Sequence, residues 1–280
     1  MRRPAHARQG DAGVPGLLVT LAQIRRSAGI QGRVIHALLL REILTRYGRH
    51  NIGFLWLFVE PMLFTTGVTT IWTVTKAVHG SNLPIVAFAL TGYSAVLLWR
   101  NMPARCIGAI GPNLALMYHR NVRIIDVFAA RVLLEAGGAS ISFVVLSLLF
   151  IYIGWLDPPV DILMVMAGWV MTAWFGAALA MMLGALAERS EIVDKLWHPI
   201  SYLMFPLSGA AFTVDALPPV AQHYLLYVPM VNGVEIVREG YFGNRFHAHY
   251  DFFYLLGCCV MLTLLALSQI AVVSREVTPE

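Results

Sequence analysis

The stretch LLLREILTRYGRHNIGFLWLFVEPMLF, residues 38–64, decides the fold because it joins a basic helix directly to a membrane-length apolar segment. One face of the predicted helix carries apolar side chains at the i, i+3, i+4, i+7 spacing, at Leu40, Ile43, Leu44 and Tyr47. The opposite face carries the cations Arg41, Arg46 and Arg49. This pattern is typical of a helix in the membrane interface, with its cations toward head groups or a partner protein. A basic anchor that only fixes the topology is the alternative interpretation.

The whole chain has the composition of an all-helical integral membrane protein. Of its 280 residues, 58% are hydrophobic and 13% are charged, and its mean hydropathy of +0.67 is too high for a soluble domain of this length. A helix needs about 20 apolar residues to cross a bilayer. Six segments approach that length: residues 54–75, 83–99, 136–155, 162–187, 196–214 and 252–273. The second is short and the fifth contains Pro199 and Pro206, so we expect these two to be tilted, broken or re-entrant.

The basic residues predict the orientation. Six spans place both termini on the same side of the membrane, and seventeen of the twenty Lys and Arg residues then lie on that side. Because basic loops stay in the cytoplasm, the sequence predicts a multi-pass protein of the cytoplasmic (inner) membrane with both termini inside. We expect a mobile basic cytoplasmic arm over residues 1–35, a single transmembrane domain over 36–275 and a cytoplasmic tail over 276–280.

Two of the connections are too apolar to be plain solvent loops. The cytoplasmic loop 100–126 mixes arginines with Ile, Leu and Met, which predicts short amphipathic helices broken near Pro103 and at the Gly-Pro pair further on. On the outer side, residues 213–251 contain two predicted short helices, 218–228 and 230–239. We expect this outer segment to form a re-entrant or interfacial hairpin before the last span.

The fourth predicted span has one face made of small residues. They recur at every fourth position, at Gly168, Thr172, Gly176, Ala180 and Gly184. That spacing lets another helix approach closely. The partner helix can belong to the same chain or to a second copy.

The first predicted span contains Glu60 followed by Pro61. A carboxylate at the bilayer centre costs on the order of 2.5–3.5 kcal/mol, so Glu60 should face protein or water rather than lipid. Pro61 lacks a backbone N–H and leaves a carbonyl that must find another partner. A structural kink is one interpretation, and we favour a polar bend beside an aqueous route.

The sequence lacks the motifs of several enzyme classes. It has no G-x-x-x-x-G-K-[ST] motif, since neither Lys76 nor Lys195 follows a glycine, and no nucleophile elbow, so no catalytic residues are predicted. His247, His249 and Asp251 alternate on the outer side, but the sequence supplies no second ligand cluster, so we expect no metal site. The cysteines are interpreted as small buried apolar residues, at Cys106, Cys258 and Cys259.

Three stretches together are similar to a known transporter family, namely REILTRYGRHNIGFLWLFVEPML, NLALMYHRNVRIIDVFAARVL and YVPMVNGVEIVREGYFG. From about residue 31 onward the chain resembles the permease subunits of type-2 ABC exporters, in particular those that export capsular and related cell-surface polysaccharides. The resemblance implies two permeases working with two separate ATPase chains, and a lipid-linked polysaccharide pushed outward between the permeases. ATP and Mg²⁺ would bind to the ATPase, so this chain needs no cofactor. Membrane lipids are further expected partners, and nucleic acid is not.

The resemblance also assigns roles to residues. The ATPase contacts that it implies fall in the basic helix and the loop 100–126, at Arg41, Arg46, Arg49, Arg105, Asn113, Arg120 and Arg123. To the translocation route we assign Glu60, Pro61 and six aromatic rings on which a sugar can slide, at Trp56, Phe58, Tyr93, Trp99, Tyr202 and Phe205. Lipid-facing packing or an interfacial belt is the alternative for each ring.

Other functions share some of these features. An exporter of the same type for O-antigen, teichoic acid or a small molecule would look the same in sequence. A membrane-embedded glycosyl- or acyltransferase is disfavoured because the sequence has no Asp-x-Asp pair for a nucleotide-sugar metal and no carboxylate in the short first outer loop, KAVHGSNL. A scaffold that only assembles other subunits predicts that no pore-facing substitution affects export.

Overall fold

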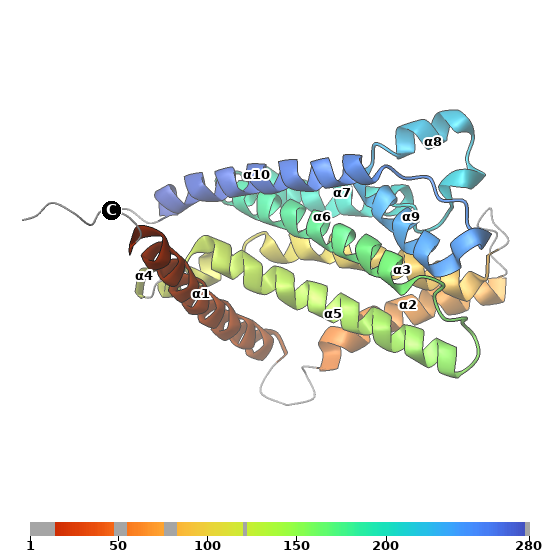
Figure 1. The fold of residues 1–280 in the computed structure, drawn as a ribbon, viewed down its shortest axis with the longest axis horizontal. Coiled ribbons are helices and arrows are strands. Elements are labelled where there is room, and N and C mark those ends of the chain that lie inside the picture. Colours follow the sequence, from red (N-terminus) through yellow and green to blue (C-terminus); the bar gives the residue numbers. More distant parts are fainter. Residues whose placement is uncertain (1–14, 48–54, 76–82, 120–121, 278–280) are drawn as a thin grey trace, which may run out of the picture.

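The computed structural model describes residues 15–47, 55–75, 83–119 and 122–277, and all regular elements in these ranges are helices (Figure 1). Five of the described helices are long and apolar enough to cross a membrane. They are α2 (Trp56–Thr75), α3 (Ile85–Cys106), α5 (Ile124–Tyr152), α6 (Ile162–Arg189) and α10 (Phe252–Val277). Figure 1 shows them running along the long direction of the molecule. The structure thus confirms the predicted all-helical membrane fold.

The segment predicted as the fifth span behaves differently from the other five. It corresponds to α7 (Glu191–Leu207), a helix of 17 residues that contains both Pro199 and Pro206. After Leu207 the chain turns at Gly209, whose φ of 78° favours glycine, and a short 3-10 helix, η3 (Val214–Ala216), follows. The helix therefore does not extend over all of residues 196–214, and the six-span topology stays a prediction.

Two helices are longer than the sequence predicts, at the expense of the loop 100–126. α3 continues through Pro103 to Cys106, and α5 begins at Ile124. Met102 and Cys106 are completely buried, so their packing outweighs the local preference of proline to end a helix. The loop that remains contains η2 (Gly111–Asn113) and α4 (Leu114–His119).

The N-terminal helix α1 (Pro15–Tyr47) begins well inside the predicted mobile arm. Residues 15–35 are therefore helical, and Val34, Ile35 and Leu39 pack beside the buried Leu38 against the core. This apolar row lies on a different face from Leu40 and Leu44, which are exposed. α1 crosses α5 at one end of the molecule (Figure 1), and this packing stabilises a helix whose first half has a weak apolar pattern.

The small-residue face of α6 packs within the chain. A Cβ atom added to Gly168 would lie 2.7 Å from the backbone nitrogen of Val237 on α9 (Pro229–Phe242), and one added to Gly176 would lie 2.8 Å from Cα of Trp99 on α3. A Cβ at Gly184 would meet Cys106 and Phe128 at 3.0 Å. Thr172 and Ala180, on the same face, are fully buried. The intramolecular alternative is therefore correct for these positions.

The segment predicted to lie on the outer side contains two short helices close to the predicted ones, α8 (Pro219–Leu225) and α9, followed by η4 (Gly243–Arg245). α8 has no buried residue, whereas α9 is buried along nearly its whole length. Contacts with α3, α6 and α10 surround α9. Whether this hairpin re-enters the bilayer stays a prediction.

Candidate functional site

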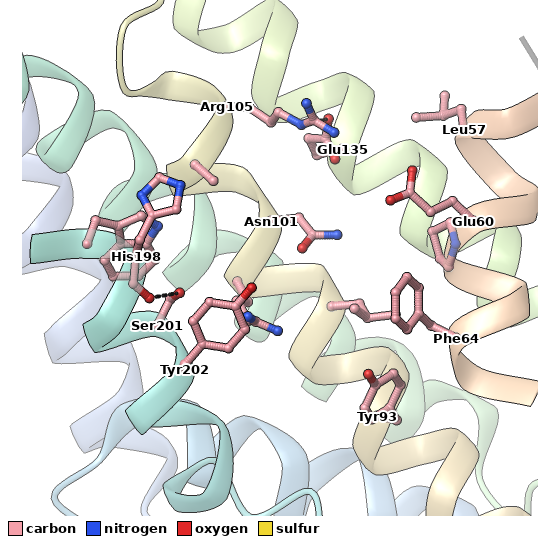
Figure 2. A pocket seen from close by; sticks show the side chains of 15 residues that line it. Leu57, Glu60, Phe64, Tyr93, Asn101, Arg105, Glu135, His198, Ser201 and Tyr202 are labelled. Carbon is pink, nitrogen blue, oxygen red and sulfur yellow. Dashed lines mark hydrogen bonds and ion pairs between the residues drawn. The ribbon is translucent and has the colours of Figure 1, made fainter. Parts of the chain in front are cut away.

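A polar cleft of about 410 Å³ lies between α2, α3, α5 and α7 (Figure 2). Glu60 and Phe64 of α2 face Asn101 and Tyr93 of α3 across it, and Ser201 and Tyr202 of α7 line another side. Its volume falls in the range of ordinary ligand pockets. The lining combines aromatic rings, an amide, a hydroxyl and charges of both signs, which suits a ligand with many hydroxyl groups and some apolar faces.

Four of the residues predicted for a translocation route line this cleft, namely Glu60, Pro61, Tyr93 and Tyr202. Tyr202 is 67% exposed, and the guanidinium carbon of Arg100 lies 4.4 Å from the centre of its ring. Phe205 does not line the cleft, but its ring meets that of Tyr93 edge-on, with 5.6 Å between the centroids. The α3 and α7 side of the cleft therefore carries two aromatic rings, Tyr93 and Tyr202, and Phe205 packs against the first of them.

The other three predicted aromatic residues lie elsewhere. Trp56 is exposed on the surface of α2, and Phe58 is half-buried, with its carbonyl accepting a hydrogen bond from the Ser142 hydroxyl at 2.9 Å. Trp99 is only 1% exposed and packs against Phe175 of α6, with 6.4 Å between ring centroids. The assignment of Trp99 to an accessible route is not supported, because the small residues of α6 bring that helix directly against it.

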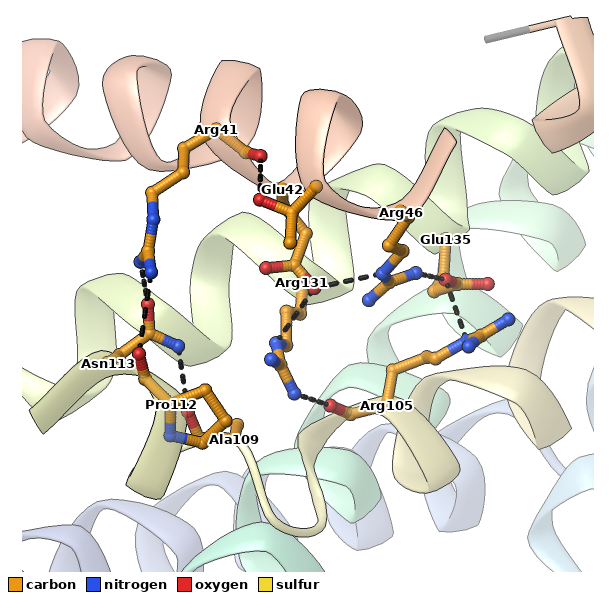
Figure 3. Close-up of polar contacts among 10 residues, drawn as sticks. Arg41, Glu42, Arg46, Arg105, Ala109, Pro112, Asn113, Arg131 and Glu135 are labelled. Atoms are coloured by element: carbon orange, nitrogen blue, oxygen red, sulfur yellow. Dashed lines mark hydrogen bonds and ion pairs between the residues drawn. The ribbon is translucent and has the colours of Figure 1, made fainter. Parts of the chain in front are cut away.

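An ionic network ties α1 to α3 and α5 (Figure 3). Glu42 of α1 accepts from Arg46 Nε at 2.9 Å and pairs with Arg131 Nε of α5 at 3.2 Å. Glu135 of α5 pairs with Arg46 Nη1 and, at 3.2 Å, with Arg105 Nε of α3. The Arg105 carbonyl in turn accepts a hydrogen bond from Arg131 Nη1 at 2.6 Å. Two carboxylates thus hold three guanidinium groups from three helices.

Arg46 is the member of the network that two carboxylates hold at once. Burial alone would lower the pKa of Arg46, but the nearby carboxylates of Glu135 and Glu42 outweigh burial, so its pKa lies above the ordinary value. The sequence pattern predicted that Arg46 points toward head groups or a partner protein. In the structure it points instead at Glu42 and Glu135 of the same chain. Glu135 and Arg105 also line the cleft, so the network that holds α1 ends inside the polar pocket.

A second polar contact joins α1 to the loop after α3. Arg41 donates from Nη1 to Asn113 Oδ1 and from Nη2 to the Pro112 carbonyl at 3.4 Å. Asn113 is buried and donates to the Ala109 carbonyl at 2.8 Å (Figure 3). Four residues predicted to contact an ATPase, Arg41, Arg46, Arg105 and Asn113, thus meet in contacts that fix α1. Arg123 is exposed at the start of α5, whereas Arg49 and Arg120 lie outside the described residues.

The polar side chains of α9 were missed as functional candidates from sequence. Arg238 is completely buried and donates to the carbonyls of Gly209, Ala210 and Phe212 at 2.6–2.8 Å. Its guanidinium carbon lies 3.8 Å from the ring centre of Phe88. The sequence does indicate that these polar side chains are unusual. In the motif VNGVEIVREG, charged residues interrupt an otherwise apolar short helix.

Two further α9 residues hold the loops around the helix. Glu235 accepts hydrogen bonds from the backbone N–H groups of Val214 at 3.4 Å and His249 at 3.1 Å. Asn232 accepts from the Asp251 N–H at 2.8 Å and donates to the Leu226 carbonyl at 2.9 Å. α9 is therefore the element around which the neighbouring loops are organised.

The comparisons with known proteins agree with this architecture. Residues 33–242 match the family model of the ABC-2 type transporters. The chain is 44% identical over 254 residues to the capsule polysaccharide export inner-membrane protein CtrC of Neisseria meningitidis serogroup B. The matched region covers 91% of this chain and 96% of CtrC. It is 42% identical to the capsule polysaccharide export inner-membrane protein BexB of Haemophilus influenzae, over 91% of this chain and 97% of BexB.

A more distant relative shows the same relationship. The polysialic acid transport protein KpsM of Escherichia coli is 28% identical over 224 residues, or 75% of this chain and 81% of KpsM. The family model covers most of the helices that form the cleft and the ionic network, from α1 to α9. The resemblance that the sequence motifs indicated is thereby confirmed, and the chain belongs to the ABC-2 type transporter family.

Proposed function

We propose that this chain is the membrane-spanning permease subunit of an ATP-driven exporter that moves a capsular or other cell-surface polysaccharide outward across the cytoplasmic membrane. The observation that carries the proposal is the match of more than 40% identity, over nearly the full length of both chains, to proteins named for capsule polysaccharide export. The polar, partly aromatic cleft supports it, because such a surface can hold sugar rings without fixing one sequence of sugars.

The exporter would contain two copies of this chain and two copies of a separate ABC-type ATPase. Membership of the family implies an ATPase partner, and ATP and Mg²⁺ would bind to that partner rather than to this chain. Both termini would lie in the cytoplasm, on the basic side predicted from the sequence. The cargo would carry a lipid anchor, and the exposed apolar faces of α2 and α7 beside the cleft are where a second copy would close the route.

The contact with the ATPase would involve the loop after α3 and the start of α5. Arg123 is exposed in this region and would contact the ATPase. Arg120, three residues before it in the sequence, belongs to the same proposal. Arg41 and Asn113 would pass a movement of that loop to α1, and Arg46 and Arg105 would pass it to the cleft. In this arrangement Arg46 is a transmitting residue and not a direct contact.

The first test is to purify the tagged chain in mild detergent from cells that express the candidate ATPase, and to assay the complex for ATP hydrolysis. A stoichiometric ATPase chain with vanadate-sensitive turnover is the expected result. A chain that comes out alone, under conditions that preserve related complexes, would contradict the proposal.

Charge reversal then tests the coupling surface. Arg123→Glu should leave insertion and assembly intact but lower export per ATP hydrolysed, because a repelling charge would face the ATPase. The matched control is Arg275→Glu, an exposed arginine near the end of α10 outside the proposed contact. Equal export by Arg123→Glu and the wild type would remove Arg123 from the contact.

The cargo is tested separately, in a strain that lacks this chain. Accumulation of a lipid-linked capsular polysaccharide inside these cells would support the proposed cargo. Accumulation of O-antigen, teichoic acid or a small molecule would instead assign the same machine to another substrate.

A further inference from the structure

Three side chains that can bind a metal converge from two separate segments. Asp215 lies in η3, before α8, and His247 and His249 lie between η4 and α10. His249 Nε2 is 3.1 Å from His247 Nδ1 and 3.0 Å from Asp215 Oδ1, and the third side of the triangle, from His247 Nδ1 to Asp215 Oδ1, is 3.6 Å. Asp251, the third residue of the sequence pattern, instead caps α10 by accepting from the Tyr254 N–H.

These spacings match the ligand set of a tetrahedral metal ion. Zn²⁺ binds imidazole nitrogen and carboxylate oxygen at about 2.0–2.2 Å, which places neighbouring ligands of a tetrahedron about 3.4 Å apart. Two of the observed distances, 3.0 and 3.1 Å, are slightly shorter than that value, and the third, 3.6 Å, is slightly longer. An ion above the triangle would therefore reach all three atoms without a change of the backbone.

Hydrogen bonds and a bound cation are two alternative ways to satisfy this arrangement, and the histidine tautomers decide between them. A neutral imidazole nitrogen is either a donor or an acceptor. If His249 Nε2 carries the ring hydrogen, it donates to Asp215. If neither His249 Nε2 nor His247 Nδ1 carries a hydrogen, both lone pairs and the Asp215 carboxylate are available to one cation. One cation at the centre would be attracted by all three atoms at once.

An independent feature shows that the two ligand-bearing segments are held in register. The buried Glu235 carboxylate accepts the N–H of His249 on one oxygen and the N–H of Val214, the neighbour of Asp215, on the other. Gln222 of α8 also donates to the Asp215 carbonyl at 3.4 Å. These contacts fix the backbone of both segments, so the three ligand-bearing residues are held near one another before an ion arrives.

We propose that Asp215, His247 and His249 form a binding site for Zn²⁺ or a related first-row divalent cation. Two imidazoles and one carboxylate favour such an ion over Ca²⁺ and Mg²⁺, which prefer oxygen ligands. The side chains of His247 and Asp215 are 76% and 57% exposed, so solvent can supply the fourth ligand. The ion would join the segments that enter and leave the α8–α9 hairpin. Asp215 is the additional ligand that the sequence pattern alone did not reveal.

The test uses the full chain in complex with its ATPase, purified through a tag without histidines and stripped with a chelator. Titration with Zn²⁺ should show one saturable site per chain, and Co²⁺ should give the visible absorption bands of tetrahedral coordination. His247→Ala and Asp215→Asn should each weaken Zn²⁺ binding by more than about 10-fold. Zn²⁺ should also raise the melting temperature of the wild type but not that of these variants.

The matched control is His223→Ala, an exposed histidine of α8 outside the triangle, which should bind Zn²⁺ like the wild type. Because His247 and Asp215 are exposed, their variants should melt like the metal-free wild type, which shows that they are folded. No saturable Zn²⁺ binding by the wild type, or equal binding by the wild type and both variants, would overturn the proposal.

Discussion

At the scale of single residues, Arg238 makes the largest demand on its surroundings. Its side chain carries a charge from α9 into the interior of the molecule. There it meets three backbone carbonyls and the ring of Phe88. Arg238→Leu would leave these carbonyls without donors and Glu235 without its nearby cation. Since each unsatisfied buried group costs about 1–3 kcal/mol, we expect a loss of at least ~3 kcal/mol in the free energy of unfolding, measured by denaturant titration in detergent.

The control for this experiment is Arg245→Leu. Arg245 is exposed and lies 3.8 Å from the exposed Asp157, and such surface pairs contribute about 0–1 kcal/mol. A loss of equal size in both variants would show that Arg238 is not a special anchor. Arg238→Lys should fall between, because lysine keeps the charge but not the planar fork that serves several carbonyls.

Residue types were easier to predict from sequence than their surroundings. Glu60, Tyr93 and Tyr202 were predicted to share one route, and they do line one cleft. Trp99 has the same chemistry but lies in the core. Amino-acid type indicates what a side chain can do, but the face of α3 that meets α6 depends on how two distant helices pack. A single sequence does not contain that pairing.

At the scale of the elements, the docking of α1 depends on a pair of opposite charges. Arg46→Met and Glu135→Gln, alone and combined, form a double-mutant cycle across α1 and α5. For a largely buried pair within a network we expect a coupling of about 0.5–3 kcal/mol in the free energy of unfolding. The exposed pair Lys195 and Glu191 provides the matched cycle, and it should give no more than about 0.5 kcal/mol. Equal couplings would mean that the Arg46–Glu135 pair does not hold α1, which would then depend on its apolar contacts and on the contacts of Arg41.

The packing of α6 against α3 gives a second prediction at this scale. Gly176→Ala would place a methyl group 2.8 Å from Cα of Trp99, and overpacking of this kind costs about 1–3 kcal/mol of unfolding free energy. Gly257→Ala in α10 is the control, since an added Cβ there meets nothing within 4 Å, and alanine should be neutral or stabilise by up to ~1 kcal/mol. The measurement is thermal unfolding. An equal drop in the melting temperature of both variants would contradict the close contact between α6 and α3.

Helix boundaries followed the sequence where apolar runs are long and differed where packing decides. α6 and α10 begin at the predicted residues 162 and 252. α1 and the ends of α3 and α5 extend into segments predicted as an arm or loop. The extensions of α3 and α5 carry Arg105, Arg131 and Glu135 of the ionic network, and the extension of α1 packs with Val34 and Ile35 on the core around Leu38. These contacts stabilise them as helices. Local pattern alone does not supply that partner surface.

At the scale of the whole molecule, the cleft and the ionic network form one continuous polar path. Arg105 and Glu135 belong to both, so the helix nearest the N-terminus is connected to the pocket that we assign to the cargo. Composition was enough to predict an all-helical membrane protein, because hydropathy is a property of the whole chain. The shared residues could not be predicted, since Glu135 lies at the edge of a predicted span and Arg105 in a predicted loop.

This connection makes the cleft itself the place to test transport. Glu60→Leu removes the carboxylate that faces the pocket. Loss of one hydrogen bond to a charged group costs about 1.5–3 kcal/mol, which corresponds to at least a roughly 10-fold loss of cargo binding. We therefore expect export to fall by about that factor while protein level and ATPase assembly stay normal. Glu276→Leu, an exposed acid near the end of α10 outside the cleft, is the control. Normal export by Glu60→Leu would mean that Glu60 and Pro61 have only a structural role, as a kink in α2. The cargo route would then lie outside this cleft.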